Sequence, residues 1–407
     1  MPNPVFACRI CRNKNLVPVL ELGDQALTGV FPKTRDTQIT VGPLTLVKCV
    51  GEEVCGLLQL AHSYDLEEMY GDNYGYRSGL NPSMVAHLRS KVDRIKRYDV
   101  IGPGDIIVDI GSNDATTLRQ YELDDCVLLG IDPTGAKFRE FYTANINLIP
   151  EFFSAQAFRA AYPGRGAKVV TSFSMFYDME DPMAFMQEVH DILEDGGIWV
   201  CEQSYMPLML STNSYDTACH EHLEYYAFAQ ITWMAERVGL RIVDVELNAV
   251  NGGSFSFVAQ KGGGMPASPA VAKLVESEAG QNLDELDTYK AFAERVERSR
   301  VELIDFLDEA KAAGRKVVAL GASTKGNVLL QYCGIDQSQI SAVGEVNPDK
   351  FGAFTPGTLL PIVDERELLG KADHYVVLPW HFRDFFESEP RYDGLDLVYP
   401  LPSLSHR

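Results

Sequence analysis

The stretch Val108-Asp109-Ile110-Gly111-Ser112-Asn113-Asp114 decides the fold of the central part of this 407-residue chain. The apolar run 106–110 has the length and composition of a buried strand, and it ends at Gly111 in a turn of small residues. In such a turn the backbone can approach a ligand closely. Asp132 closes the next apolar run, 127–132, and an acidic residue at that place can bind both hydroxyls of a ribose. The stretch therefore predicts a nucleoside-binding edge of a parallel sheet.

Further apolar runs extend this pattern toward the C-terminus. Strands are predicted at 168–172 and 197–202, separated by helical stretches, which is typical of a doubly wound parallel α/β sheet. The glycine run 262–264 is typical of a linker, and a long charged helix follows over about 284–313. The run 316–321 then begins a second, Rossmann-like α/β unit. We expect an N-terminal module, a central domain and a C-terminal domain at residues 1–75, 76–265 and 266–407.

The composition restricts the class of protein. Hydrophobic residues make up 46% of the chain, and the formal charge is −21. Nonspecific affinity for nucleic acid comes mainly from Lys and Arg, so this acidity argues against a nucleic-acid partner. The chain shows no apolar run of about 20 residues, the length of a membrane span, and no signal-peptide pattern at its start. We expect a cytoplasmic protein without a membrane partner, as a monomer or weak dimer.

Four of the eight cysteines lie in the first 55 residues, as the pairs Cys8/Cys11 and Cys49/Cys55. In a cytosolic chain clustered cysteines are typical of metal ligands rather than disulfides. Two close pairs suit a tetrahedral zinc site, because each pair supplies two thiolates. The second pair has five intervening residues rather than two, and four unrelated thiols are the alternative. A closed four-thiolate site leaves no open coordination position, so the predicted zinc has a structural role.

Two cofactor classes are compatible with the turn at Gly111. A dinucleotide requires three glycines, in the spacing Gly-x-Gly-x-x-Gly, to place its pyrophosphate on a helix N-terminus. Here only Gly111 is present, and Asp109 and Asp114 would oppose a pyrophosphate. S-adenosylmethionine has no phosphate and carries an amino group and a sulfonium, so it is the predicted cofactor. NAD or an ordinary turn without a ligand are the alternatives. The residues expected to bind the cofactor are Asp109, Gly111, Ser112, Asn113, Asp132 and Ser174.

The segment Cys219-His220-Glu221-His222 follows the predicted strand at 197–202. Histidine is the usual general base near neutral pH, and a neighbouring glutamate can orient its imidazole. A zinc site of the metalloprotease type is not expected, because that motif places its histidines four residues apart. The segment therefore predicts a general base, with a polar surface loop as the alternative.

A second loop of small residues, 321–327, follows a strand and opens a helix. N–H groups at a helix N-terminus attract anions, and Lys325 adds a positive charge. The loop lacks the Walker spacing, and we interpret it as a candidate diphosphate cradle, with a packing turn as the alternative. Trp380-His381-Phe382 either faces the same cleft or forms a buried corner. The residues expected to form the cradle are Ser323, Thr324, Lys325 and Asn327.

Taken in order, these motifs resemble those of the S-adenosylmethionine-dependent sugar C-methyltransferases of deoxysugar pathways, which methylate C3 of a nucleotide-linked 4-keto-6-deoxy sugar. The resemblance covers nearly the whole chain. It rests on Cys8-x-x-Cys11 with Leu22-Gly23, on 55–60, 74–79 and 109–114, on Asp216-Thr217 with 220–222, and on 252–254, 321–327, Asn347-Pro348 and 356–358.

The resemblance implies a zinc domain, a central cofactor domain and a C-terminal domain, with the nucleotide-sugar between the last two. It implies that His222 is the base, that Glu221 supports it, and that Tyr74 or Tyr76 acts at the sugar. Many family members have a tyrosine where this chain has Cys219. Another group must then hold the sugar or stabilise its enolate, which indicates a different substrate or acceptor atom.

The leading hypothesis is therefore a C-methyltransferase in which His222 forms an enolate beside a ketone, with His220 or a tyrosine hydroxyl at the enolate oxygen. Cys219 is expected to line the substrate site. An O- or N-methyltransferase acting on another phosphorylated metabolite is the second hypothesis. A nicotinamide-dependent sugar oxidoreductase or epimerase and a non-catalytic, zinc-containing nucleotide-sugar-binding scaffold are the others.

Overall fold

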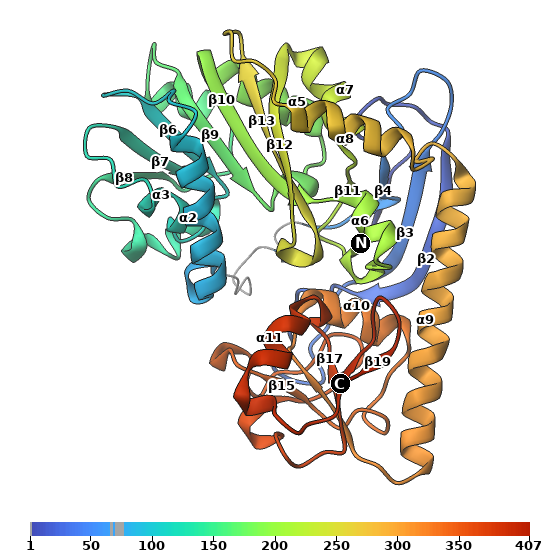
Figure 1. Cartoon of the computed structure of the whole chain (residues 1–407). Helices are drawn as coiled ribbons and strands as arrows, with labels where there is room; N and C mark the ends of the chain where they lie inside the picture. The colour runs from blue at the N-terminus through green and yellow to red at the C-terminus, as the bar shows by residue number, and fades with distance from the viewer. Residues whose placement is uncertain (1, 66–67, 70–76) are drawn as a thin grey trace.

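The structure, a computed structural model, describes residues 2–65, 68–69 and 77–407. Within these residues the chain forms three large sheets, one each in an N-terminal module, a central domain and a C-terminal domain (Figure 1). The predicted α/β class is confirmed. Across the described ranges no helix is both long and apolar enough to cross a bilayer.

The sheet of the N-terminal module is antiparallel and has the order β11-β4-β3-β2. Its strand β11 (Glu224–Tyr225) comes from the central part of the chain, shortly after His222, and pairs with β4. The segment that carries the predicted base is therefore attached to the N-terminal module. The strands that the module itself contributes are β1 (Asn3–Pro4), β2 (Leu16–Ala26), β3 (Val41–Cys49), β4 (Leu58–Leu60) and β5 (His62–Ser63).

The central domain contains a seven-stranded sheet in the order β12-β13-β10-β9-β6-β7-β8. The strands from β10 to β8 in this order are parallel, and β13 runs antiparallel to both of its neighbours. The carboxyl ends of β6 and β9 therefore meet at one edge. The bounds are β6 (Ile106–Ile110), β7 (Val127–Ile131), β8 (Ile146–Ile149), β9 (Ala167–Phe173), β10 (Leu193–Ser204), β12 (Leu240–Asn248) and β13 (Ser254–Lys261).

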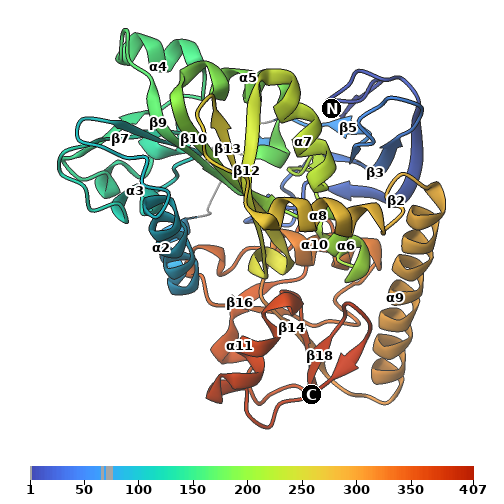
Figure 2. The same cartoon turned by 45° about the horizontal axis from the view of Figure 1, so that its top comes forward.

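Helices cover both faces of the central sheet. One face packs against α2 (Pro82–Lys96) and α3 (Thr116–Arg119) through Val92, Ile95 and Leu118. The other face is more aromatic and packs against the remaining helices of the domain (Figure 2). These are α4 (Ala155–Ala161), α5 (Pro182–Ile192), α7 (Phe228–Val238) and α8 (Pro269–Ala279), while α6 (Met206–Ser211) follows β10.

Helix α8 lies beyond residue 265, where we expected the central domain to end, yet it packs on the central sheet. Leu274 belongs to the same core as the strands. The carboxylate of Glu278 accepts hydrogen bonds from the Tyr205 hydroxyl (2.7 Å) and from the backbone N–H groups of Phe228 (2.7 Å) and Ala229 (2.9 Å). The packing of the central domain thus continues to the end of α8.

The C-terminal domain contains a six-stranded sheet in the order β16-β15-β14-β17-β18-β19, parallel except for β19. The chain leaves β14 on one side for β15 and β16 and returns to its other side with β17. Open α/β sheets bind ligands at such a switch point, outside the carboxyl ends of the strands. The bounds are β14 (Val317–Leu320), β15 (Val343–Glu345), β16 (Ile362–Asp364), β17 (His374–Val377), β18 (Leu397–Tyr399) and β19 (Ser405–His406), with α10 (Thr324–Tyr332) and α11 (Arg383–Ser388).

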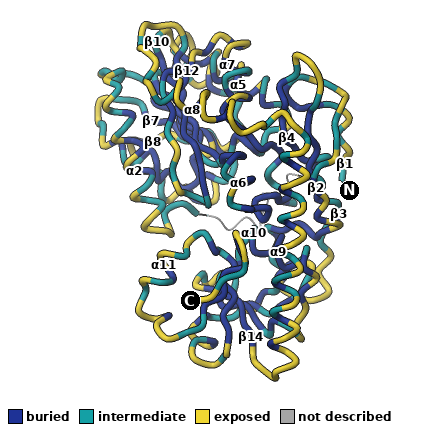
Figure 3. Tube along the Cα trace, turned by 45° about the vertical axis from the view of Figure 1, so that its right-hand side comes forward, coloured by how far each residue is buried: buried dark blue, intermediate teal, exposed yellow. Residues whose placement is uncertain are grey.

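Helix α9 (Leu286–Ala312) joins the parts along one side of the molecule, as Figure 1 shows. Its first half buries Tyr289 and Phe292 in the core that contains Leu20 of β2, and its second half buries Leu303 and Leu307 in the C-terminal part of that core. In Figure 3 the central and C-terminal sheets are largely buried. Because the cysteine end of the N-terminal module belongs to the central core, the module contacts both other domains.

Candidate active site

The four N-terminal cysteines form one cluster. All their Sγ atoms lie within 4.8 Å of one another, with 3.4 Å between Cys8 and Cys55 and 3.6 Å between Cys11 and Cys49. Tetrahedral zinc with bonds of about 2.3 Å places its sulfur ligands about 3.8 Å apart. The donor set and the spacing therefore fit a structural zinc ion.

The turn after β6 has the backbone of a ligand-binding loop. Gly111 (φ +70°), Asn113 (φ +48°) and Ala115 (φ +58°) all adopt the left-handed conformation, which residues with a Cβ adopt rarely. A Cβ on Gly111 would lie 3.2 Å from Cγ of Met175. Such outliers gather at functional sites, where the surrounding structure holds them in place.

Two carboxylates hold this turn. Asp132, at the end of β7, accepts a hydrogen bond from the backbone N–H of Asn113 (2.7 Å). Asp109 is buried within β6 and accepts one from the Thr171 hydroxyl (2.5 Å). Burial raises the pKa of Asp109 to about 7, while the Thr171 hydrogen bond opposes this shift. Asp132 therefore lies at the edge where a ribose is expected, and Asp109 supports the turn from inside the sheet.

Two predicted cofactor residues complete this edge. Ser174 follows β9, has a φ of +55°, and donates its N–H to the carbonyl of Glu202 (2.7 Å). The Ser112 and Tyr142 hydroxyls are hydrogen-bonded to each other (2.8 Å). The turn after β6 and the residue after β9 are thus brought together at the carboxyl ends of adjacent strands.

Ser78 and Gly79, the last residues of the motif 74–79, contact the same turn. The backbone N–H of Ser78 donates to the Asn113 side chain (3.0 Å), and that of Gly79 donates to the Asp114 carboxylate (3.1 Å). The predicted residues Tyr74 and Tyr76 lie outside the described residues. The Asn113 and Asp114 side chains thus attach residues 78 and 79 to the turn.

His222 is half-buried, and its environment fixes its protonation. Its Nδ1 is 2.9 Å from the carbonyl of Thr217, which can only accept, so Nδ1 carries the proton and Nε2 has the free lone pair. Its ring packs on Tyr177 with the ring centroids 4.2 Å apart. Burial lowers the pKa of His222 to about 4, and the charge of Lys325 acts in the same direction. His222 is therefore neutral at pH 7 and can accept a proton.

Cys219 and His220 have packing positions. His220 is fully buried, and its ring meets Tyr64 of the N-terminal module edge-on, with the centroids 4.5 Å apart. Cys219 is also fully buried, and burial together with the charge of Glu221 raises the pKa of its thiol well above the usual value. Neither residue offers surface to a ligand in this structure, so His222 is the histidine of this segment that is placed for chemistry.

Glu221 lies between loops of the other two domains. A Cβ built on Gly29 would lie 2.1 Å from Oε1 of Glu221 and 3.6 Å from the Thr324 hydroxyl. Glycine at position 29 is therefore required for the carboxylate to occupy this place. No local pattern in the sequence marks Gly29, because the contact joins residues that are far apart in the chain.

We expect Gly29→Ala to displace Glu221 and to lower kcat by about 10-fold or more, the scale on which small displacements in an active site act. Steady-state kinetics measure the change. Gly264→Ala is the matched control, because a Cβ at Gly264 meets no atom within 4 Å. Equal activity of the two variants would show that the position of Glu221 is unimportant.

The residues of the predicted diphosphate cradle have separate contacts. The Ser323 hydroxyl caps α10 by accepting the N–H of Gly326 (3.0 Å), and the Asn327 amide donates to the carbonyl of Thr28 (2.8 Å). Lys325 instead reaches the central domain, where its Nζ donates to the carbonyl of Asn251 (2.6 Å). Sequence reasoning missed Asn251, although it directly precedes the Gly252-Gly253 motif.

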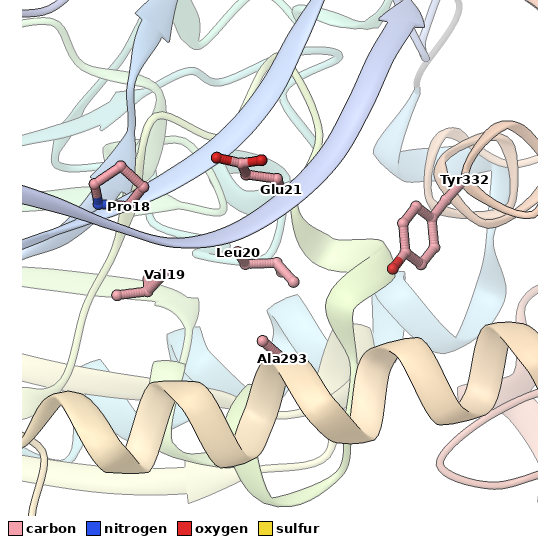
Figure 4. Close-up of a pocket in the computed structure, with 6 residues that line it drawn as sticks. All are labelled: Pro18, Val19, Leu20, Glu21, Ala293 and Tyr332. Atoms are coloured by element: carbon pink, nitrogen blue, oxygen red, sulfur yellow. The ribbon is translucent and has the colours of Figure 1, made fainter.

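A separate depression of 330 Å³ lies where β2, α9 and α10 meet (Figure 4). None of the residues predicted for the cofactor, the base or the diphosphate lines it, so it is not part of this site. Its lining residues are Pro18, Val19, Leu20, Glu21, Ala293 and Tyr332.

Family models match successive parts of the chain: a zinc binding domain at residues 8–70, a methyltransferase domain at 84–245 and a C-methyltransferase C-terminal domain at 249–402. C-methyltransferase NovU from Streptomyces niveus is 28% identical over 407 residues, which cover 98% of this chain and 96% of NovU. The chain is an S-adenosylmethionine-dependent C-methyltransferase, similar to NovU over nearly its whole length. The predicted enzyme class, zinc and S-adenosylmethionine are thereby confirmed for this C-methyltransferase.

Two solved structures illustrate more distant similarity. An O-methyltransferase family protein from Burkholderia thailandensis is 16% identical, with a TM-score of 0.38, and the match covers 49% of this chain and 64% of that one. The N-methyltransferase NodS from Bradyrhizobium japonicum, in complex with S-adenosyl-L-homocysteine, is 13% identical, with a TM-score of 0.33. That match covers 44% of this C-methyltransferase and 88% of NodS.

Proposed function

We propose that this C-methyltransferase methylates a carbon next to the ketone of a nucleotide-linked 4-keto-deoxysugar, with His222 as the base. The observation that carries the proposal is the fixed tautomer of His222. Thr217 holds its Nδ1 proton at 2.9 Å and leaves Nε2 free. The ring follows Glu221, which lies near Thr324 at the start of α10. The sugar itself comes from the family resemblance.

The reaction needs three events at this site. The bound cofactor supplies an electrophilic methyl group on a sulfonium. His222 Nε2 takes the proton from the carbon beside the ketone, and the electron pair of the C–H bond moves to form an enolate. The enolate carbon then forms a bond to the methyl group as the S–CH₃ bond breaks, and the ketone is restored. In this proposal Asp132 and Ser174 hold the cofactor, and the nucleotide binds at the switch point between β14 and β17.

The direct test is an incubation with S-adenosylmethionine and the 4-keto-6-deoxyglucose derivatives of dTDP, UDP, GDP and CDP, followed by NMR of the products. We expect a new C–CH₃ group on one of them. With S-adenosylhomocysteine in place of the methyl donor, the enzyme in D₂O should exchange the hydrogen beside the ketone. Methylation of an oxygen or nitrogen without such exchange would contradict the proposal and favour the second hypothesis.

The pKa of His222 predicts the acid side of the pH profile. A base acts in its neutral form, and the pKa of His222 is lowered to about 4 by burial and by Lys325. Activity therefore persists as the pH falls through 6.5, the ordinary pKa of histidine, and is lost only as it approaches the lowered value. The measurement is kcat/KM from pH 4.5 to 8. A half-maximal value near pH 6.5 would show that the base titrates like a solvated histidine.

A further inference from the structure

Lys325 belongs to the C-terminal domain, but its side chain contacts the central domain. Its Nζ donates to the carbonyl of Asn251 (2.6 Å), and the Asn251 amide donates to the hydroxyl of Ser174 (3.4 Å). Asn251 (φ +55°) and Ser174 (φ +55°) are both left-handed, so the connection is held by two unusual backbone conformations. Asn251 thus connects the ammonium group to Ser174, the residue that follows β9.

A glycine lies beside this ammonium group. A Cβ built on Gly252 would lie 3.9 Å from Lys325 Nζ and 3.6 Å from Cβ of His381. Gly252 (φ +87°) has no side chain to fill the space between them. An ammonium group has three N–H donors, and one of them is used by Asn251. Two donors therefore remain.

Lys325 interacts electrostatically with one carboxylate and two imidazoles. Burial lowers the pKa of Lys325, and the carboxylate of Asp216 raises it. The Asp216 carboxylate itself is held by the indole N–H of Trp380 (2.9 Å). Burial together with the charge of Lys325 lowers the pKa of His222 to about 4 and that of His381 to about 3. The charge of Lys325 thus acts on both imidazoles.

We propose that Lys325 is a catalytic residue: its ammonium group holds the substrate oxygen that becomes negative when His222 removes the proton. This inference rests on the proposed function. Removal of a proton beside a ketone places the charge on the carbonyl oxygen, and a preorganised donor there stabilises the transition state. The imidazole of His222 accepts the proton, and the ammonium group of Lys325 stabilises the negative charge on the oxygen. Nothing is oxidised, and the charge on oxygen disappears when the carbon bonds to the methyl group.

The rest of the loop supports this assignment over a diphosphate cradle. The Ser323 hydroxyl accepts the N–H of Gly326 and so caps α10. The Asn327 amide donates to the carbonyl of Thr28. Thr324 lies near Glu221, across from Gly29. Ser323 and Asn327 are thus engaged within the protein, and the position of Thr324 near Glu221 brings the chain neighbours of Lys325 and His222 together.

The test compares Lys325→Met and Lys325→Arg with wild type, with Lys371→Met, an exposed lysine of the same domain, as the control. On the keto sugar that wild type methylates, we expect Lys325→Met to lower kcat by about 10²–10³-fold with little change in KM. Lys325→Arg should recover part of the loss. The calorimetric affinities of Lys325→Met for dTDP and UDP should stay within about 2-fold of wild type. If Lys325 bound the diphosphate, its removal would lower these affinities by about 10-fold or more. In proton NMR the pKa of His222 should rise in Lys325→Met and stay in Lys371→Met.

Each other result overturns the inference. An unchanged kcat with weaker dTDP or UDP binding would make Lys325 a diphosphate ligand. An unchanged pKa of His222 in Lys325→Met would show that the two groups do not face the same space. If wild type methylates none of the keto sugars, the proposed function fails and the catalytic role of Lys325 fails with it. If wild type is active and Lys325→Met keeps its kcat, the inference fails alone.

Discussion

His222→Asn is expected to lower kcat by about 10²–10⁴-fold, the usual contribution of a general base. Asparagine can still donate a hydrogen bond to the carbonyl of Thr217, which accepts from Nδ1 of His222 at 2.9 Å. It has no basic nitrogen at the position of Nε2. The substitution therefore removes the base while keeping the shape of the segment. The affinity for S-adenosylmethionine should not change, because the cofactor turn is held by Asp132 of the central domain and not by the segment of His222.

Two measurements separate loss of the base from loss of the fold. His190→Asn, on the partly exposed surface of α5, is the matched control and should keep wild-type kcat. The exchange of substrate hydrogen with D₂O in the presence of S-adenosylhomocysteine should fall in His222→Asn together with kcat. A variant with near-wild-type kcat would remove His222 from the mechanism. If the variant exchanged the substrate hydrogen at the normal rate but did not methylate, His222 would act after the substrate has been deprotonated.

The parallel core of the central sheet could be predicted from the sequence because each of its strands is a short apolar run. The predicted runs at 106–110, 127–132 and 168–172 all became strands. Strands β8, β12 and β13 were missed, and two of them, β8 and β12, form the edges of the sheet. Their order and the reversed direction of β13 depend on contacts between distant segments, which no local pattern records.

The site was predictable where one motif carries one function. The turn at Gly111 and the basic nitrogen of His222 are examples, since each is set by its own segment. The different positions of His220 and His222 were not predictable, because they depend on β11 joining the N-terminal sheet. Gly29 and Asn251 were missed for the same reason, since each matters only through a contact with another domain.

Cys11→Ser is expected to remove zinc and, with it, most of the activity, although the cysteines are not part of the chemistry. Structural zinc contributes on the order of 10 kcal/mol to the folding of a small module, so loss of one thiolate should lower the melting temperature as well as the zinc content. Turnover should fall by about 10–100-fold, the scale typical of residues that hold the groups of a site in position. The measurements are metal analysis, thermal unfolding and kcat, with Cys126→Ser, a half-buried cysteine outside the cluster, as the control.

The physical route from the zinc to the base is short. Cys8 is followed by Arg9, a fully buried residue whose guanidinium donates to the carbonyl of Leu60 at the end of β4 (2.7 Å). The same guanidinium lies 3.6 Å from the carboxylate of Glu224 in β11. Because β11 begins two residues after His222, a change at the cysteine cluster reaches the base through one arginine and one pair of strands.

Arg9→Met therefore distinguishes this route from a general loss of the fold. It keeps all four thiolates, so zinc should remain bound, while the buried carboxylate of Glu224 loses its partner. We expect kcat to fall in this variant with the affinity for S-adenosylmethionine unchanged, because the cofactor turn is held by Asp132 and not by the module. If Cys11→Ser lost its zinc and kept wild-type kcat, the N-terminal module would not be needed to position His222. A loss of cofactor affinity in Arg9→Met would place the effect in the central domain as a whole and not in the base segment.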